Sequence, residues 1–198
     1  MIVQELMLSV LPRLDSVAGV DIVQAANAAT RGIGKRLAAR RSDLVKEPWS
    51  VRFPAASGIS LPPEFLGFAE DPTLISGSTR TALSPLRPGE RADLDREGVP
   101  ARYELIWPRL FLFPYPATEV LLKGMAFQLP PPVTDMMDSL PWDGVLDDLL
   151  TEAAFRVASV GMTHISDPAF ESYIGQELDR ILPVRTGARP RRAAGYHY

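Results

Sequence analysis

Proline spacing constrains this chain more than any other feature. Nineteen of its 198 residues are proline, and most of them fall between residues 48 and 141. That share is roughly twice the usual value of about 5%. Proline removes a backbone donor and clashes with the preceding helical turn, so this region excludes long helices and favours short strands with many turns. The chain is long enough for one sizeable core, and we expect a single domain over residues 1–182.

Helical periodicity appears before the proline-rich region. Residues 20–45 place Ile22, Ile33 and Leu37 on one apolar stripe, with basic residues crowded into the last turns, as the helix dipole favours. A shorter helix is expected at residues 2–11. These two helices form an N-terminal pair within residues 1–47.

Arg40 interrupts the apolar stripe of the second helix. Arg40 lies on the apolar face of the helix, because it follows Ile33 by seven residues, or about two turns. One interpretation is a side chain whose stem lies along the helix end while its charge reaches water. The other is an ion pair across an interface between subunits, which makes Arg40 our candidate interface residue.

The helical period returns after residue 138. Residues 139–162 carry early acids and then an apolar face, which predicts a helix that starts at Ser139 and Pro141 and ends near Gly161. A further helix is expected from Pro168 to residue 182, capped by Asp167.

The order of these segments predicts the fold class. We expect an α+β fold in which the helix pairs at 1–47 and 139–182 form a helical bundle, because short amphipathic helices are marginal unless their apolar faces are buried. A proline-rich antiparallel β insertion at 48–138 lies between the pairs. Its expected strands are residues 49–53, 65–69, 74–76, 79–83, 101–107, 109–113 and 118–128, the last three forming a meander.

The stretch RLFLFPYPATEVLLKGMAFQLPPP, residues 109–132, is apolar and aromatic. Arg109, Glu119 and Lys123 interrupt it too often for a membrane span. We expect two core strands joined at FPYPAT, with LPPP turning the chain out of the sheet. A secretory signal is also not expected, because Glu5 lies among the first apolar residues and no basic start precedes it.

Charge is unevenly spread along the chain. The net charge is −3, but residues 139–182 carry two arginines against eight acids, and residues 183–198 carry four arginines and no acid. The last segment has no apolar period, so we expect an extended arm that orders on a partner. Arginine with tyrosine suits either nucleic acid or a protein interface, and the acidic chain favours a protein. The candidate residues are Arg185, Arg189, Arg191, Arg192, Tyr196 and Tyr198.

No motif defines an active site. The absence of cysteine excludes disulfides, cysteine zinc sites and thiol nucleophiles. GIGKR at residues 32–36 lacks the full spacing and the preceding strand of a phosphate loop. His164, in THISD, is interpreted as a loop residue, and Asp148, Glu152 and Arg156 as a solvated helix face with one Glu152–Arg156 pair. We therefore predict no catalytic residue, no cofactor and no metal.

Four phrases carry a family resemblance. They are ISLPPEFLGF, GVPARYEL, RLFLFPYPAT and FQLPPPVTDMMDSLPWDGVLDDLLTEAAFRVA, within about residues 45–182. They resemble the head-to-tail adaptor (connector) proteins of tailed bacteriophages. Members look similar in an LP-x-x-F-L entry into strands, a G-x-P-x-x-Y strand, an aromatic strand ending P-x-P, and an LP start to a helix that continues LL-x-x-A. These motifs are structural rather than catalytic.

The resemblance implies a structural protein of the virion neck, assembled in the host cytoplasm. Such adaptors form a ring, usually a dodecamer, between the portal protein and a tail or nozzle protein. DNA then passes through the channel without sequence-specific binding, and no membrane is involved. In such adaptors, a terminal extension commonly binds the portal protein. We expect residues 183–198 to have this role. The alternatives are another neck or tail-completion protein, or a small hydrolase that uses acidic residues.

Overall fold

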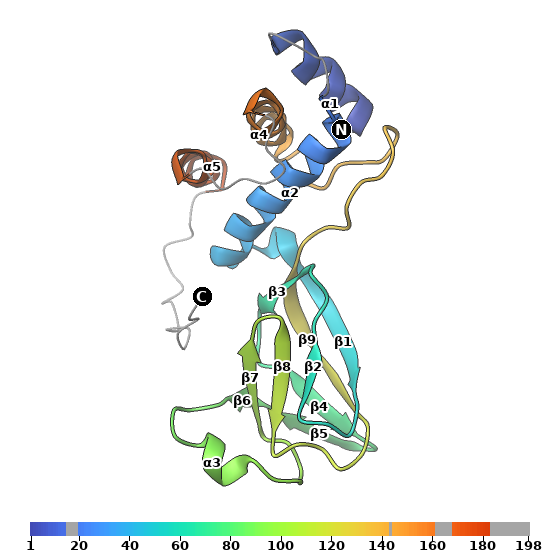
Figure 1. The fold of residues 1–198 in the computed structure, drawn as a ribbon, viewed down its shortest axis with the longest axis vertical. Coiled ribbons are helices and arrows are strands. Elements are labelled where there is room, and N and C mark those ends of the chain that lie inside the picture. Colours follow the sequence, from blue (N-terminus) through green and yellow to red (C-terminus); the bar gives the residue numbers. More distant parts are fainter. Residues whose placement is uncertain (15–19, 143, 161–167, 183–198) are drawn as a thin grey trace. The chain divides into compact units, whose positions relative to one another are not determined.

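The computed structural model describes residues 1–14, 20–142, 144–160 and 168–182 (Figure 1). The contacts among these residues divide the chain into two compact units. Within the described part, the first unit holds residues 1–45 and 129–182, and the second holds residues 46–128.

The first unit is helical. Its described helices are α1 (Val3–Val10), α2 (Ile22–Ala39), α4 (Asp147–Val160) and α5 (Pro168–Ile181), and the 3-10 turns η1 (Leu11–Arg13) and η2 (Asp43–Val45) follow α1 and α2. Helix α2 begins where the Asp21 side chain accepts a hydrogen bond of 3.0 Å from the Gln24 N–H. It ends at Ala39 with Arg40 as its C-terminal cap, and Arg41 then adopts a left-handed conformation with φ of 56°. The helix therefore stops before residue 45, where the periodicity predicts its end.

Helix α2 is the centre of the first unit, because it contacts α1, α4 and α5. Its buried face is rich in alanine, with Ala26 and Ala29 fully enclosed beside Ile33 and Leu37. Small side chains let neighbouring helices approach closely, since the distance between packed helices depends on the residues at the contact. Each large aliphatic side chain buried here contributes about 1.5–3 kcal/mol. The opposing buried residues are Leu149, Leu150, Ala153 and Val157 on α4 and Ile174 and Leu178 on α5.

Residues 129–142 run along the first unit without regular structure. The Asn27 side chain donates to the Val133 carbonyl and accepts from the Val133 N–H, both at 2.8 Å. Trp142 Nε1 donates to the Leu44 carbonyl at 3.0 Å. Gly34 makes room for this segment, because a Cβ there would lie 2.6 Å from Leu129 Cδ2. The Asn27 side chain thus replaces hydrogen bonds that a helix or sheet would supply to Val133.

The second unit contains two sheets. In the larger, β1 (Lys46–Phe53), β9 (Val120–Gln128), β4 (Thr73–Ser76) and β5 (Thr79–Ala82) lie side by side in that order, and β3 (Phe65–Phe68) also pairs with β9. The pairs of this sheet are antiparallel, and β1 opposes β9 along its whole length, from Lys46 against Phe127 to Phe53 against Val120. Strand β9 is therefore the central strand.

The smaller sheet has the order β2 (Gly58–Ser60), β8 (Arg109–Phe113), β7 (Arg102–Ile106) and β6 (Ser84–Pro85). Strands β7 and β8 form an antiparallel hairpin, whereas β6 and β7 are parallel. The short helix α3 (Arg91–Leu94) lies in the connection between β6 and β7.

One hydrophobic core unites the second unit. Trp49, Phe65 and Phe68 form an aromatic cluster, with ring centroids 5.0–5.4 Å apart, and Tyr103 of the smaller sheet meets Phe68 at 5.2 Å. Tilted and edge-on pairs at these distances are favourable beyond their burial. The aliphatic part of this core is Leu61, Leu74, Leu83, Leu110, Leu112, Val120 and Leu122.

The predicted fold class is wrong. The structure is a mixed α/β fold with two sheets and about 29% strand, so its strands are not one antiparallel insertion between two terminal helix pairs. Helices are scattered along the chain. The charged segment 87–98 is expected to form one or two helical turns, and α3 lies within it. The predicted meander also fails, because β8 and β9 belong to different sheets. FPYPAT therefore carries the chain from one sheet to the other instead of joining paired strands.

The predicted helix over 139–162 begins too early. Helix α4 starts at Asp147, while Ser139 forms an isolated bridge with Ile2 and Trp142 has a left-handed φ of 60°. The indole hydrogen bond to Leu44 holds Trp142 in this conformation. A contact of this kind, distant in sequence, overrides the local helical signal of the acids and the proline.

Candidate partner-binding surfaces

The predicted arm lies outside the described residues. This applies to all six candidate residues: Arg185, Arg189, Arg191, Arg192, Tyr196 and Tyr198. Their role in binding a partner stays a prediction. The THISD segment and its His164 also lie outside the described residues.

Arg40 makes an ion pair within the chain. Its Nη2 donates to the Gly175 carbonyl at 2.5 Å and lies 3.0 Å from Asp179 Oδ1, both on α5. The side chain is only 23% exposed, and Nη1 is buried without a hydrogen-bond partner among the described residues. Arg40 therefore links α2 to α5, and its role at an interface between subunits stays a prediction.

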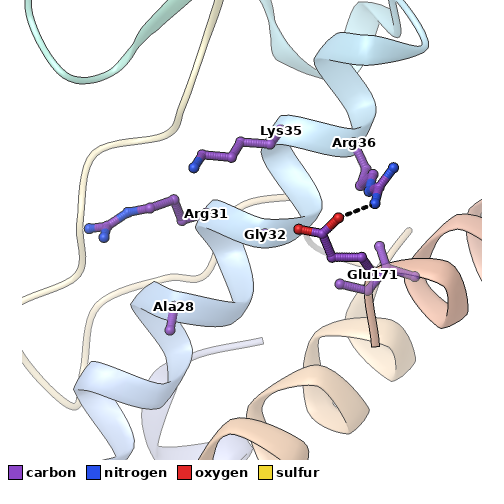
Figure 2. Close-up of a pocket in the computed structure, with 7 residues that line it drawn as sticks. Ala28, Arg31, Gly32, Lys35, Arg36 and Glu171 are labelled. Carbon is purple, nitrogen blue, oxygen red and sulfur yellow. Dashed lines mark hydrogen bonds and ion pairs between the residues drawn. The ribbon is translucent and has the colours of Figure 1, made fainter. Parts of the chain in front are cut away.

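Arg36, one turn before Arg40, is also bonded to α5. It forms an ion pair with Glu171 (Figure 2). Glu171, Gly175 and Asp179 lie four residues apart, so they share one face of α5. Two arginines of α2 therefore bind a row of acceptors on α5. The bonded residues are 135 or more positions apart in the sequence.

A second pair of cations on α2 has a different environment. Arg31 and Lys35 are exposed, and neither forms a hydrogen bond or ion pair with a described residue. Figure 2 shows both side chains extending to the same side of α2, away from the Arg36–Glu171 pair. They line a cavity of about 120 Å³ together with Ala28, Gly32, Arg36, Glu171 and Ile174. Three of the lining residues, Gly32, Lys35 and Arg36, belong to the GIGKR segment.

The predicted Glu152–Arg156 pair is confirmed, but a third residue joins it. Glu152 Oε1 accepts from Arg156 Nε at 3.0 Å, and Oε2 accepts from Arg13 Nη2 at 2.6 Å. Burial raises the pKa of Glu152, but hydrogen bonds and charges from the two arginines outweigh it and hold that pKa below its ordinary value. The guanidinium groups also stack, each at 4.1 Å, with Arg13 over Phe155 and Arg156 over Tyr173. These ion pairs and ring contacts connect η1, α4 and α5.

The second unit presents an apolar tip. Ile106 and Trp107, 48% and 53% exposed, lie at the turn of the β7–β8 hairpin, followed by Pro108. Both residues were expected in a strand, and this is confirmed for Ile106, the last residue of β7, whereas Trp107 lies in the turn. The proline after Trp107 was the available signal, because it places the turn directly behind this residue.

The described part of the chain contains neither a metal-ligand cluster nor a phosphate loop. No group of three or more histidine, cysteine, aspartate or glutamate residues there could hold a metal ion. GIGKR lies inside α2, without the strand that precedes a phosphate loop. None of the described helices combines the length and apolarity needed to cross a membrane. No family model matches the chain, and a search of curated proteins finds no match.

Proposed function

We propose that this chain is a structural subunit of a tailed-bacteriophage virion, a head-to-tail adaptor that forms a ring between portal and tail and extends the DNA channel. One observation carries the proposal. Three of the four phrases that resemble adaptor proteins are separated in sequence, yet they meet in the core of the second unit. Leu61 and Phe65 come from the first phrase, Tyr103 from the second and Leu112 from the third. Three of the four phrases therefore fall in one folded unit, whereas most of the fourth, residues 127–158, lies in the first unit, so the resemblance extends over both units.

The surfaces of the two units also favour a subunit with several partners. The second unit exposes Ile106 and Trp107 side by side, and tryptophan is enriched where proteins bind each other. Beside a cavity on α2, the first unit carries two cations that have no ion pair with a described residue, Arg31 and Lys35. An apolar tip and a charged face suit chemically different contacts.

In this proposal, neighbouring copies contact each other around the ring, and one end of the ring binds the portal protein. The basic residues from Arg185 onward provide the portal contact, and the other end of the ring receives a tail or nozzle protein. DNA passes through without base readout. The subunit works in the virion neck, after assembly in the host cytoplasm, and performs no enzymatic step.

The test is co-expression with the portal protein of the same phage. The complex is purified, its mass is measured with and without portal, and the particles are imaged. A ring seated directly on the portal supports the proposal. Failure to form any portal complex contradicts it, and binding to tail components alone identifies a neck or tail-completion protein instead.

A further inference from the structure

Helix α5 is anchored by fewer buried apolar side chains than α4, among the side chains that the structure describes. Both helices have 14 residues. The buried side chains of α5 are Ile174 and Leu178, and those of α4 are Leu149, Leu150, Ala153, Ala154 and Val157. A short amphipathic helix takes most of its stability from the burial of its apolar face. The attachment of α5 therefore depends more strongly on its other contacts.

These other contacts join α5 to α2 through charge. Arg36 pairs with Glu171 (Figure 2). Arg40 lies 3.0 Å from Asp179 and donates to the Gly175 carbonyl at 2.5 Å. The four charged side chains are between 23% and 62% exposed, so dissolved ions can screen the pairs. Because the Debye length falls from about 10 Å at 0.1 M salt to about 3 Å at 1 M, the attachment of α5 weakens as the salt concentration rises.

Two features of the closed arrangement favour its opening. Gly175 is in the middle of α5, although a Cβ there would meet nothing within 4 Å. Packing therefore does not require glycine at this position, and glycine makes the helix less stable than alanine would. Arg40 Nη1 is buried without a hydrogen-bond partner among the described residues. Opening returns this donor to water, which offsets part of the cost of breaking the ion pairs.

We propose that α5 is a releasable strap on the first unit. The strap is closed over α2 by the Arg36 and Arg40 contacts, and it opens as a unit at raised ionic strength while α1, α2 and α4 stay packed together. Closure withholds both arginines from any other anion, so the strap is an autoinhibitory contact. Elements that move in regulation are commonly drawn from such units of low local stability. The strap belongs to the first unit alone and does not depend on the adaptor role.

Hydrogen exchange of the full-length protein tests the strap. Relative to their intrinsic rates, the amides of residues 174–179 should exchange about tenfold faster than those of residues 150–157. Raising sodium chloride from about 0.1 M to about 1 M should accelerate the α5 amides several-fold and leave the α4 amides unchanged. Equal protection of the two helices, or a salt response that they share, overturns the proposal.

Substitutions on α5 then identify what holds the strap closed. The double variant Glu171→Gln, Asp179→Asn removes both charged partners of α2 but keeps side-chain size and helix propensity nearly constant. Its α5 amides should exchange several-fold faster than those of the wild type at low salt and should lose their response to salt. The matched control is Glu177→Gln, because Glu177 pairs with Arg180 of α5 itself, and it should keep the wild-type salt response. A double variant that also keeps this response contradicts the strap.

Gly175→Ala provides a change in the opposite direction. It leaves the backbone carbonyl that accepts from Arg40 in place. Since alanine favours a helix over glycine by about 1 kcal/mol, the α5 amides should exchange about fivefold more slowly, with no change in α4. Slowing of both helices to the same extent would show that they open together, which is incompatible with a strap that opens by itself.

Discussion

At the scale of single residues, Gly34 is under a steric constraint that Gly175 does not share. Both glycines are inside helices, but a Cβ at Gly34 would lie 2.6 Å from Leu129 Cδ2, whereas one at Gly175 meets nothing within 4 Å. Gly34→Val should therefore lower the free energy of unfolding by about 1–3 kcal/mol through overpacking. Gly175→Val, the matched control, should be close to neutral, because valine and glycine have similar, low helix propensities. Urea unfolding of both variants measures the difference, and equal effects would contradict it.

Glu152 should make stability depend on pH. Its folded pKa lies below the ordinary value of 4.5, so its contribution is present above that pH and is lost as the pH falls through the folded pKa. At neutral pH, Glu152→Gln should cost about 1 kcal/mol, since the pairs with Arg13 and Arg156 are partly exposed. On acidification the wild type should converge on the variant.

The control for Glu152 is Glu119→Gln. Glu119 forms a more exposed pair with Arg52, and its loss should change stability by less than about 0.5 kcal/mol. Thermal melts over the pH range test both variants. A difference between wild type and Glu152→Gln that persists unchanged in acid would refute the role of this carboxylate.

Arg40 shows what sequence can predict about a single residue. Its position on an apolar stripe marked it as unusual and suggested an ion pair. The partners, Gly175 and Asp179, are more than 130 residues away and are chosen by the packing of α5 on α2. Periodicity identifies such a residue, but only tertiary structure supplies what it contacts.

At the scale of elements, the irregular segment after β9 depends on Asn27. Because its side chain satisfies both backbone groups of Val133, Asn27→Ala leaves a part-buried donor and acceptor unpaired and should cost about 1–3 kcal/mol. Asn27→Asp keeps the acceptor for the Val133 N–H and loses only the donor. Hydrogen exchange of the Val133 amide should therefore accelerate strongly in the first variant and less in the second. Unchanged exchange in both would contradict the contact.

The basic arm should act in attachment rather than in folding. Arg185, Arg189, Arg191 and Arg192 are the only charged side chains after Arg180. Deleting residues 185–198 should leave the thermal melt unchanged and weaken portal binding, because these charges supply the proposed electrostatic contact. A pull-down with portal at increasing salt measures this. Binding of the deleted chain at wild-type strength and salt dependence would show that the arm is dispensable.

Strands could be located from sequence more readily than their partners. The segments at 109–113 and 118–128 were expected as strands, and β8 and β9 occupy them closely. Both bury alternate or consecutive apolar residues, so their patterns contain nothing that assigns them to different sheets. Pairing is decided by long-range contacts such as β9 with β1, which a local pattern does not encode.

At the scale of the whole molecule, the second unit should fold alone. Its core residues all lie within residues 46–128, and Lys46 opposes Phe127, so the two ends of this segment are neighbours. The isolated segment should show a cooperative melt and a β-type circular dichroism spectrum. Exchange-broadened or undispersed amide resonances would show that it needs the rest of the chain.

The pairing of β1 with β9 also has a mechanical consequence. The chain enters this unit at Lys46 and leaves it after Gln128, on adjacent antiparallel strands. A force that separates residues 45 and 129 therefore breaks the β1–β9 hydrogen bonds one after another, starting at Lys46 and Phe127. It does not load all of these bonds at the same time. Under tension the unit should yield at low force from this end, so that any strain reaching it opens β1 and β9 before it disturbs the aromatic cluster.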